Sequence, residues 1–314
     1  MAGFVLRRII NLIPVAFIVL LGTFSLIHIA PGNPAYTILG EQASPSAVHL
    51  LEVKLGLNRP LVVQFLVYLG HAVRGNLGRS LLDNQSVAQL IVTRLPVTLE
   101  LAALAVIVSL IIALPAGILA AYRPNTWIDS LSRFLALVGA AVPNFWLALL
   151  LVYFLAVAHH WLPALGWVPL NQGVGSNLVH LVMPVIVLAL PLVAVTSRVL
   201  RGELLEVMHA MFIQVARAKG ARERAVMLRH ALKNALIPVV TVVGLQVGGL
   251  LGGVVITESI FSLPGMGQLV VNAIFDRDYT VLQGSVLFMA MVVLIVNLLV
   301  DLCYAWLDPR IRYN

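Results

Sequence analysis

Six long runs of apolar residues follow one another along the chain. Each run approaches or exceeds the about 20 apolar residues that a helix needs to cross the hydrocarbon core of a bilayer. Internal prolines such as Pro115, Pro184 and Pro191 are compatible with such helices, because neighbouring helices satisfy the carbonyl groups that a proline frees. The pattern therefore predicts six transmembrane helices, at residues 9–30, 98–121, 134–158, 178–200, 236–257 and 283–307.

Two shorter apolar stretches lie between the first two predicted spans. Residues 61–73 are mostly apolar and follow Pro60, a typical helix start, but about 13 residues are too few to cross a bilayer. Residues 46–55 form a second short amphipathic pattern, begun by Ser44 and Pro45. We expect both to be helices that pack on the bundle or lie in the membrane interface. Counting either one as a span would invert the orientation of every later segment.

The composition supports a membrane environment. The chain has 314 residues, of which 61% are hydrophobic and 11% are charged, whereas soluble domains carry about 25% charged residues. Too few charges remain to cover a water-facing surface. We therefore predict an all-α, polytopic membrane helix bundle that forms a single transmembrane domain over residues 1–314. Its largest parts outside the membrane are an outer segment, residues 31–97, and an inner loop, residues 201–235.

The basic residues set the orientation. The net charge is +7, and cytoplasmic loops of membrane proteins carry an excess of Lys and Arg. With both termini in the cytoplasm, the loop 201–235 becomes the most basic inner loop, and the outer loop 159–177 carries no Lys or Arg. Arg7 and Arg8 precede the first run as in a signal peptide, but the run is too long for one. We expect a retained first span and cytoplasmic N and C termini.

The inner loop 201–235 shows a pattern of its own. Phe212, Val215, Ala216 and Lys219 follow one another at i, i+3, i+4 and i+7 and would share one helix face. Gly220 lets the chain turn, and a second short helix is predicted from about residue 222 to 236. Such a surface helix suits a groove in another protein. Taken on charge alone, the alternative is a basic loop that only binds anionic lipid.

The residue order across the whole chain resembles a known family, the permeases of ATP-binding-cassette (ABC) importers. The resemblance is narrower to the first, B-type permease subunit of the dipeptide, oligopeptide and nickel transporters. It rests on the loop motif Ala216–Gly220 together with the run from His230 to Pro238. The other matching motifs are Leu6–Arg8, Pro31–Pro34, Leu55–Leu57, Thr98–Leu101, Pro143–Trp146, Pro264–Gly267, Arg277–Tyr279 and Asp308–Arg312.

The chain departs from the family pattern at four places. Gln214, Val215 and Ala216 stand where the broad family has Glu-Ala-Ala, and Met211-Phe212 replaces an acidic residue and a tyrosine. Phe212 keeps an aromatic ring, so coupling need not suffer. Asn33 replaces an aspartate and Leu263 a tryptophan, both in parts expected on the outer side, where they bear on the partner or the substrate.

The resemblance implies a membrane-spanning subunit of an ATP-driven, binding-protein-dependent importer in the bacterial inner membrane. Its expected partners are a homologous second permease, two ATPase subunits and an extracytoplasmic substrate-binding protein. ATP and Mg²⁺ would be bound by the ATPase subunits, and no cofactor by this chain. The implied cargo is a di- or oligopeptide, with nickel, glutathione or another small solute as alternatives. The residues expected to couple to the ATPase are Phe212, Val215, Ala216, Arg217, Ala218, Lys219, Gly220 and His230.

Three residues within the predicted spans are candidates for the translocation pathway or for packing against the partner permease: Gln246, Gly248 and Asn297. Polar groups in a membrane tend to face protein or water. Hydrogen bonding between helices is the alternative for Gln246 and Asn297, and close helix packing is the alternative for Gly248, one of a series of glycines in the fifth span. A self-contained secondary transporter or channel is the competing class of protein, and it would need buried ion-binding charges.

No catalytic or metal-binding residue is expected. The sequence contains neither an HExxH motif nor the GxSG motif of an intramembrane serine protease. His159 and His160 are adjacent, but no Asp, Glu or Cys cluster accompanies them. The single cysteine, Cys303, offers no disulfide partner within the chain.

Overall fold

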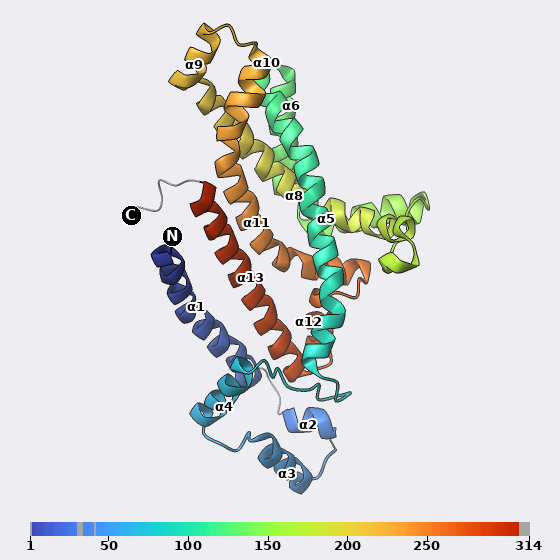
Figure 1. Cartoon of the computed structure of the whole chain (residues 1–314). Helices are drawn as coiled ribbons and strands as arrows, with labels where there is room; N and C mark the ends of the chain where they lie inside the picture. Colours follow the sequence, from blue (N-terminus) through green and yellow to red (C-terminus); the bar gives the residue numbers. More distant parts are fainter. Residues whose placement is uncertain (1, 30–33, 41, 308–314) are drawn as a thin grey trace. The chain divides into compact units, whose positions relative to one another are not determined.

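The computed structural model describes residues 2–29, 34–40 and 42–307, and these form helices with no strand among them. The all-α prediction is confirmed. Figure 1 shows the helices, whose bounds are α1 Ala2–Ile29, α2 Pro34–Leu39, α3 Pro45–Leu55, α4 Leu61–Val73, α5 Val87–Tyr122, α6 Trp127–Ala141, α7 Asn144–Leu151, α8 Val174–Met208, α9 Met211–Ala218, α10 Glu223–Ala225, α11 Leu232–Phe261, α12 Met266–Phe275 and α13 Tyr279–Leu307. Two π-helical stretches, Val152–Ala158 and Val226–Ala231, and one short 3₁₀ turn, Leu170–Gln172, complete the set.

Four helices among the described residues are long and apolar enough to cross a membrane, or up to six if each of two bent helix pairs counts as one span. Most predicted spans lie within longer helices. For example, α5 has 36 residues and begins at Val87, well before the predicted start at residue 98. Likewise, α8 extends beyond both predicted ends to cover 35 residues.

The third predicted span is wrong as a single helix. The chain bends by 99° between α6 and the helix that starts at Asn144. The reason lies in Val142-Pro143: Val142 is extended, with φ −73° and ψ 122°, as expected for a residue before proline. A second bend, of 76°, separates residues 252–261 from α12.

The two short helices predicted in the segment 31–97 are confirmed. Ser44 caps α3 by accepting a hydrogen bond from the Ala47 amide at 3.4 Å, and α4 starts directly after Pro60. Predictions that concern Asn33, the side chain of Cys303 or residues 308–312 fall outside the described part of the chain.

The contacts divide the chain into two compact units, and the divisions fall inside α5, between α11 and α12, and inside α13. Among the described residues, the first unit contains residues 99–263 and 295–307, and the second contains those within 2–98 and 264–294. In the first unit, α8 and α11 lie side by side (Figure 1) and α6 packs on α8. In the second, α1 contacts α4, and Val87, Ile91, Met266 and Leu269 share an apolar core. Each unit therefore has a core of its own.

Candidate functional site

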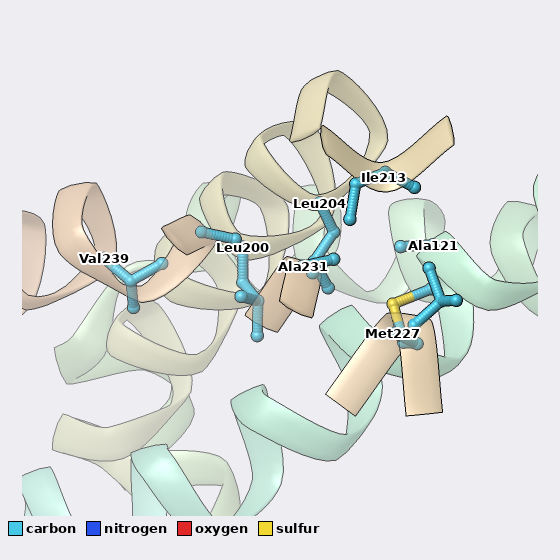
Figure 2. Packing of buried hydrophobic residues seen from close by; sticks show 9 residues of the cluster. Ala121, Leu200, Leu204, Ile213, Met227, Ala231 and Val239 are labelled. Atoms are coloured by element: carbon cyan, nitrogen blue, oxygen red, sulfur yellow. The ribbon is translucent and has the colours of Figure 1, made fainter. Parts of the chain in front are cut away.

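The segment that joins α8 to α11 carries α9, a helix of eight residues held by one buried side chain. Ile213 is fully buried and lies beside Leu204 of α8 in an apolar cluster that also contains Ala231 (Figure 2). On the other side of α9, Phe212 and Val215 are 46% and 49% exposed. Thus α9 is attached to the rest of the chain by Ile213, while Phe212 and Val215 face outward.

A hollow of about 310 Å³ lies along this outward face. The four residues predicted to share a face of α9 all line it, and two residues beyond the turn complete it. The lining residues are Phe212, Val215, Ala216, Lys219, Ala221 and His230. The walls are mostly apolar, and Lys219 adds one cationic side chain. Such a surface is suited to a partner that presents an apolar side chain next to an acidic one.

The turn at Gly220 brings the two halves of the hollow together. Gly220 has φ +83°, in the left-handed region that glycine adopts without steric cost. The Ala221 amide donates to the Ala216 carbonyl at 3.2 Å and the Gly220 amide donates to the Arg217 carbonyl at 2.9 Å. These bonds satisfy carbonyl groups at the end of α9.

An ion pair crosses the same turn. Arg217 Nε and Nη2 donate to the two carboxylate oxygens of Glu223, at 2.7 and 3.1 Å. This hydrogen bonding raises the pKa of Arg217. Arg217 is therefore bound to its own chain, and neither it nor Ala218 lines the hollow. Their assignment to ATPase coupling stays a prediction, and the geometry gives Arg217 the role of holding the turn.

The second short helix predicted in this loop is not a separate element. From Glu223 the chain runs through the π-helical stretch Val226–Ala231 straight into α11, and residues 223–250 behave as one long helix. Val226 and Met227 are buried in the cluster that receives Ile213. An inserted π turn accommodates one extra residue within a helix, so the hollow is built directly on the end of α11.

An ion pair that sequence reasoning did not find lies beside this loop. Arg201, near the end of α8, donates through Nε and Nη2 to Asp129 of α6, at 2.5 and 2.7 Å. Asp129 is fully buried, and it also accepts from the Asn125 amide at 3.0 Å. A bidentate pair of this kind fixes both partners. It ties the loop before α6 to the helix that carries α9. Only the side-by-side packing of α6 and α8 brings these residues together, although they are 72 positions apart.

The three candidate pathway residues lie on α11 and α13, and their role in a pathway stays a prediction. Gln246 of α11 donates to the Thr196 hydroxyl of α8 at 3.1 Å, which is the bond between helices considered as the alternative. Gly248 is buried on α11 and Asn297 is half-buried on α13.

Another glycine of α11, Gly244, lies very close to α13. A Cβ atom on Gly244 would meet the Val300 side chain at 2.5 Å.

Other residues noted in the sequence have local partners. Glu100 accepts a hydrogen bond from the Trp167 indole at 3.1 Å. The His159 and His160 rings each approach a backbone carbonyl of the preceding helix, at 2.7 and 3.0 Å. Leu263, expected to bear on a partner or substrate, is fully buried. It packs inside its own chain, so it makes no direct contact with a partner or substrate in this structure, and an indirect effect on either stays a prediction.

Two family models match the chain. Residues 113–313 match the binding-protein-dependent transport system inner membrane component, and residues 1–102 match the N-terminal part of the same type of membrane component. A dipeptide transport system permease protein of Alkalihalophilus pseudofirmus, DppB, is 44% identical over the full length of both chains. A glutathione transport system permease protein of Escherichia coli, GsiC, is 38% identical, again over the full length of both chains.

The fold has solved counterparts. The membrane chain of the inward-facing MetNI methionine ABC transporter aligns with a TM-score of 0.55 and 20% identity, covering 70% of this chain and 97% of the other. A second crystal form of the same transporter gives a TM-score of 0.56 at 17% identity. At these identities the likeness concerns the fold.

Proposed function

Because this chain belongs to the family of binding-protein-dependent transport system inner membrane components, we propose that it forms half of the translocation pathway of an ABC importer and couples to an ATPase through the hollow on α9. It is a multi-pass permease of the bacterial inner membrane. Active transport needs an energy source, and in this proposal the energy enters through a partner subunit that docks on α9.

The observation that carries this proposal is the construction of α9. One face is fixed to the chain by Ile213, and the opposite face presents Phe212, Val215 and Ala216 around a hollow. A partner that pushes on this face moves α8 and α11 with it, because the buried cluster under α9 includes side chains of both helices. Such an arrangement converts a movement of the docked subunit into a movement of two membrane helices.

The proposed partners follow from this role. A homologous second permease completes the pathway, two ATPase subunits bind ATP and Mg²⁺, and a substrate-binding protein delivers cargo from outside. Hydrolysis of ATP takes place in the ATPase subunits, so this chain is not itself an enzyme. The N and C termini and the hollow on α9 face the cytoplasm in this proposal, in keeping with the basic residues of the loop 201–235.

The proposed cargo is a di- or oligopeptide. The support is the 44% identity, over the full length, with a permease named for dipeptide transport. Glutathione, which is itself a tripeptide, is the alternative suggested by the 38% identity with GsiC.

The test uses one tryptophan substitution in the hollow. Ala216→Trp fills the space beside Phe212, so we expect ATP-driven uptake by the assembled transporter to fall about tenfold or more, which corresponds to a loss of roughly 1.4 kcal/mol of docking energy. Arg224→Trp is the matched control, because Arg224 is exposed and does not line the hollow. Unchanged uptake in Ala216→Trp, with the protein inserted at normal levels, would refute the coupling role.

A cross-link identifies the partner directly. Cys303 is the only cysteine of the chain, so Ala216→Cys in a Cys303→Ser background provides one defined thiol. After gentle solubilisation from the native membrane, the cross-linked product should contain an ATPase subunit, and the second permease should co-purify. Recovery of this chain alone would favour a self-contained transporter or channel instead.

A further inference from the structure

A second hollow, of about 420 Å³, lies in the unit that contains the N-terminal helices. Its walls come from α1, the turn before α4, α4 itself, the loop after α4 and the start of α13. The coupling role proposed above uses none of these residues. The volume falls within the range of about 300–1,000 Å³ typical of small-ligand sites.

The helix α4 has two different faces around this hollow. Gln64, Val67, Tyr68 and His71 follow one another at i, i+3, i+4 and i+7 and all line it. On the opposite side, the apolar residues Val62, Leu66 and Val73 are 70%, 58% and 78% exposed. A short helix with such an exposed apolar stripe is suited to the interface between lipid and water. We therefore expect the hollow behind it at the depth of the lipid headgroups.

The charge of the hollow is one-sided. Arg59 lines it and carries a permanent positive charge, while no acidic residue belongs to its wall among the described residues. In the described part of the chain, Arg59 forms no ion pair. Its side chain lies over Gly56, with Cδ and Nε each 3.7 Å from where a Cβ on that residue would stand. An unpaired guanidinium at the edge of a cavity is suited to bind a phosphate or carboxylate in bidentate fashion.

The remaining walls supply a neutral, ordered surface. The Tyr68 hydroxyl lies 3.0 Å from the Thr23 hydroxyl of α1, and burial raises the pKa of Tyr68, so this phenol stays neutral. Gln283 of α13 donates to the Thr23 carbonyl at 3.2 Å. Phe24 packs against Tyr68, with ring centroids 6.0 Å apart. These contacts hold the wall in place, while Arg59 and His71, which also line the hollow, are exposed.

We propose that this hollow binds the headgroup phosphate of an anionic phospholipid, with Arg59 pairing with the phosphate and the acyl chains lying along the apolar face of α4. A lipid is the occupant that the structure favours, because the site lies directly behind a helix face that itself requires lipid. A soluble anion also carries a phosphate or carboxylate group that pairs with Arg59, but it gains nothing from contact with the apolar face of α4.

The experiment measures lipid retention by the assembled transporter. The complex is placed in nanodiscs of phosphatidylglycerol, or of phosphatidylcholine with the same acyl chains, and the lipids that remain bound after release are counted by native mass spectrometry. We expect wild-type protein to retain phosphatidylglycerol in preference to phosphatidylcholine. Arg59→Gln should lower the retention of phosphatidylglycerol about tenfold, as expected for the loss of a charge-assisted pair.

Two further variants separate loss of the site from loss of the fold. Val67→Trp fills the hollow without touching Arg59, and it should lower lipid retention as Arg59→Gln does. Arg74→Gln removes a charge that is exposed at the end of α4 and lies outside the hollow, so it should retain lipid like the wild type. Phosphatidylglycerol should also raise the thermal unfolding midpoint of wild type and Arg74→Gln more than that of Arg59→Gln.

Three results would overturn the proposal. The first is equal retention of phosphatidylglycerol by wild type and Arg59→Gln. The second is equal retention of phosphatidylcholine and phosphatidylglycerol by the wild type. The third is displacement of the bound lipid by inorganic phosphate or by a dipeptide, which would assign the hollow to a soluble anion. None of these measurements depends on ATP-driven uptake, so they stand apart from the test of coupling.

Discussion

Gly220 is the residue on which the hollow of α9 depends most directly. With φ at +83° it lets Ala221 turn back to the Ala216 carbonyl, and this places Ala221 and His230 opposite Phe212. A Cβ atom at this position would meet no heavy atom within 4 Å. The backbone conformation is therefore the main cost that a substitution at Gly220 has to meet.

We predict that Gly220→Val lowers ATP-driven uptake several-fold, whereas Gly220→Asn retains most of it. A residue with a Cβ in the left-handed region costs roughly 1–2 kcal/mol, and a β-branched side chain costs more, while Asn adopts this region comparatively easily. Uptake is compared at equal amounts of inserted protein. Equal loss in both variants would mean that the absence of a side chain, and not the conformation, is what matters at Gly220.

At the scale of the helices, two contacts decide how α6, α8, α11 and α13 pack in their unit. The first is the buried pair between Asp129 and Arg201. The second is the close approach of Gly244 to Val300. Each brings together residues that are far apart in the sequence, and each gives a prediction with a matched control.

For the first contact, we predict that Asp129→Ala destabilises the protein by about 3–5 kcal/mol, the usual cost of removing one partner from a buried ion pair. Arg133→Gln is the control. Arg133 Nε lies 3.5 Å from the same carboxylate, but its side chain is 53% exposed, so we expect about 0–1 kcal/mol. Thermal unfolding in detergent measures both variants, and a similar small shift in the two would show that Asp129 contributes little.

For the second contact, we predict that Gly244→Ala costs about 1–3 kcal/mol through overpacking, because the new methyl group meets the Val300 side chain at 2.5 Å. Gly249→Ala is the control on the same helix, since nothing lies within 4 Å of its Cβ position. The same unfolding measurement applies. A neutral Gly244→Ala would show that α13 moves away from α11 at little cost.

At the scale of the whole molecule, the proposed orientation rests on the distribution of basic residues. Six of the 20 Lys and Arg residues fall in the segments expected outside, five of them in the long segment 31–97, and the loop 201–235 carries seven of those expected inside. This asymmetry determines orientation during insertion. In the proposed orientation the hollow of α9 lies on the cytoplasmic side and the loop after α4 on the opposite side.

We predict the following for Arg224→Cys in the Cys303→Ser background, because Arg224 is exposed and lies outside the hollow. This cysteine should react with a membrane-impermeant maleimide in inverted vesicles, but not in cells with a permeabilised outer membrane and an intact inner membrane. Asn84→Cys, in an exposed turn with φ +57°, should react in the opposite pattern. Labelling of both positions from the same side would refute the orientation, and with it the coupling proposal.

Much of the fold could be predicted from the sequence, because its signals are local. The apolar runs lie within α5, α8, α11 and α13, and the start of α3 at Ser44 follows from the capping chemistry of one side chain. The face of α9 could also be predicted, since residues at i, i+3, i+4 and i+7 share a side of any helix. The same reasoning missed the 99° bend after α6, although Pro143 was visible as its signal.

By itself, the sequence determined that the chain is helical and membrane-spanning, and it determined which residues share the face of α9, because hydrophobicity and helical periodicity act over a few residues. Only the tertiary structure decided that Asp129 pairs with Arg201, that Gln246 bonds to Thr196, and that Arg59 borders a hollow without an acidic partner among the residues described. These relations join residues that are distant along the chain or separated by a turn. The free energies of these contacts depend on how the helices pack, and the pattern of hydrophobic and polar residues along the chain does not contain that information.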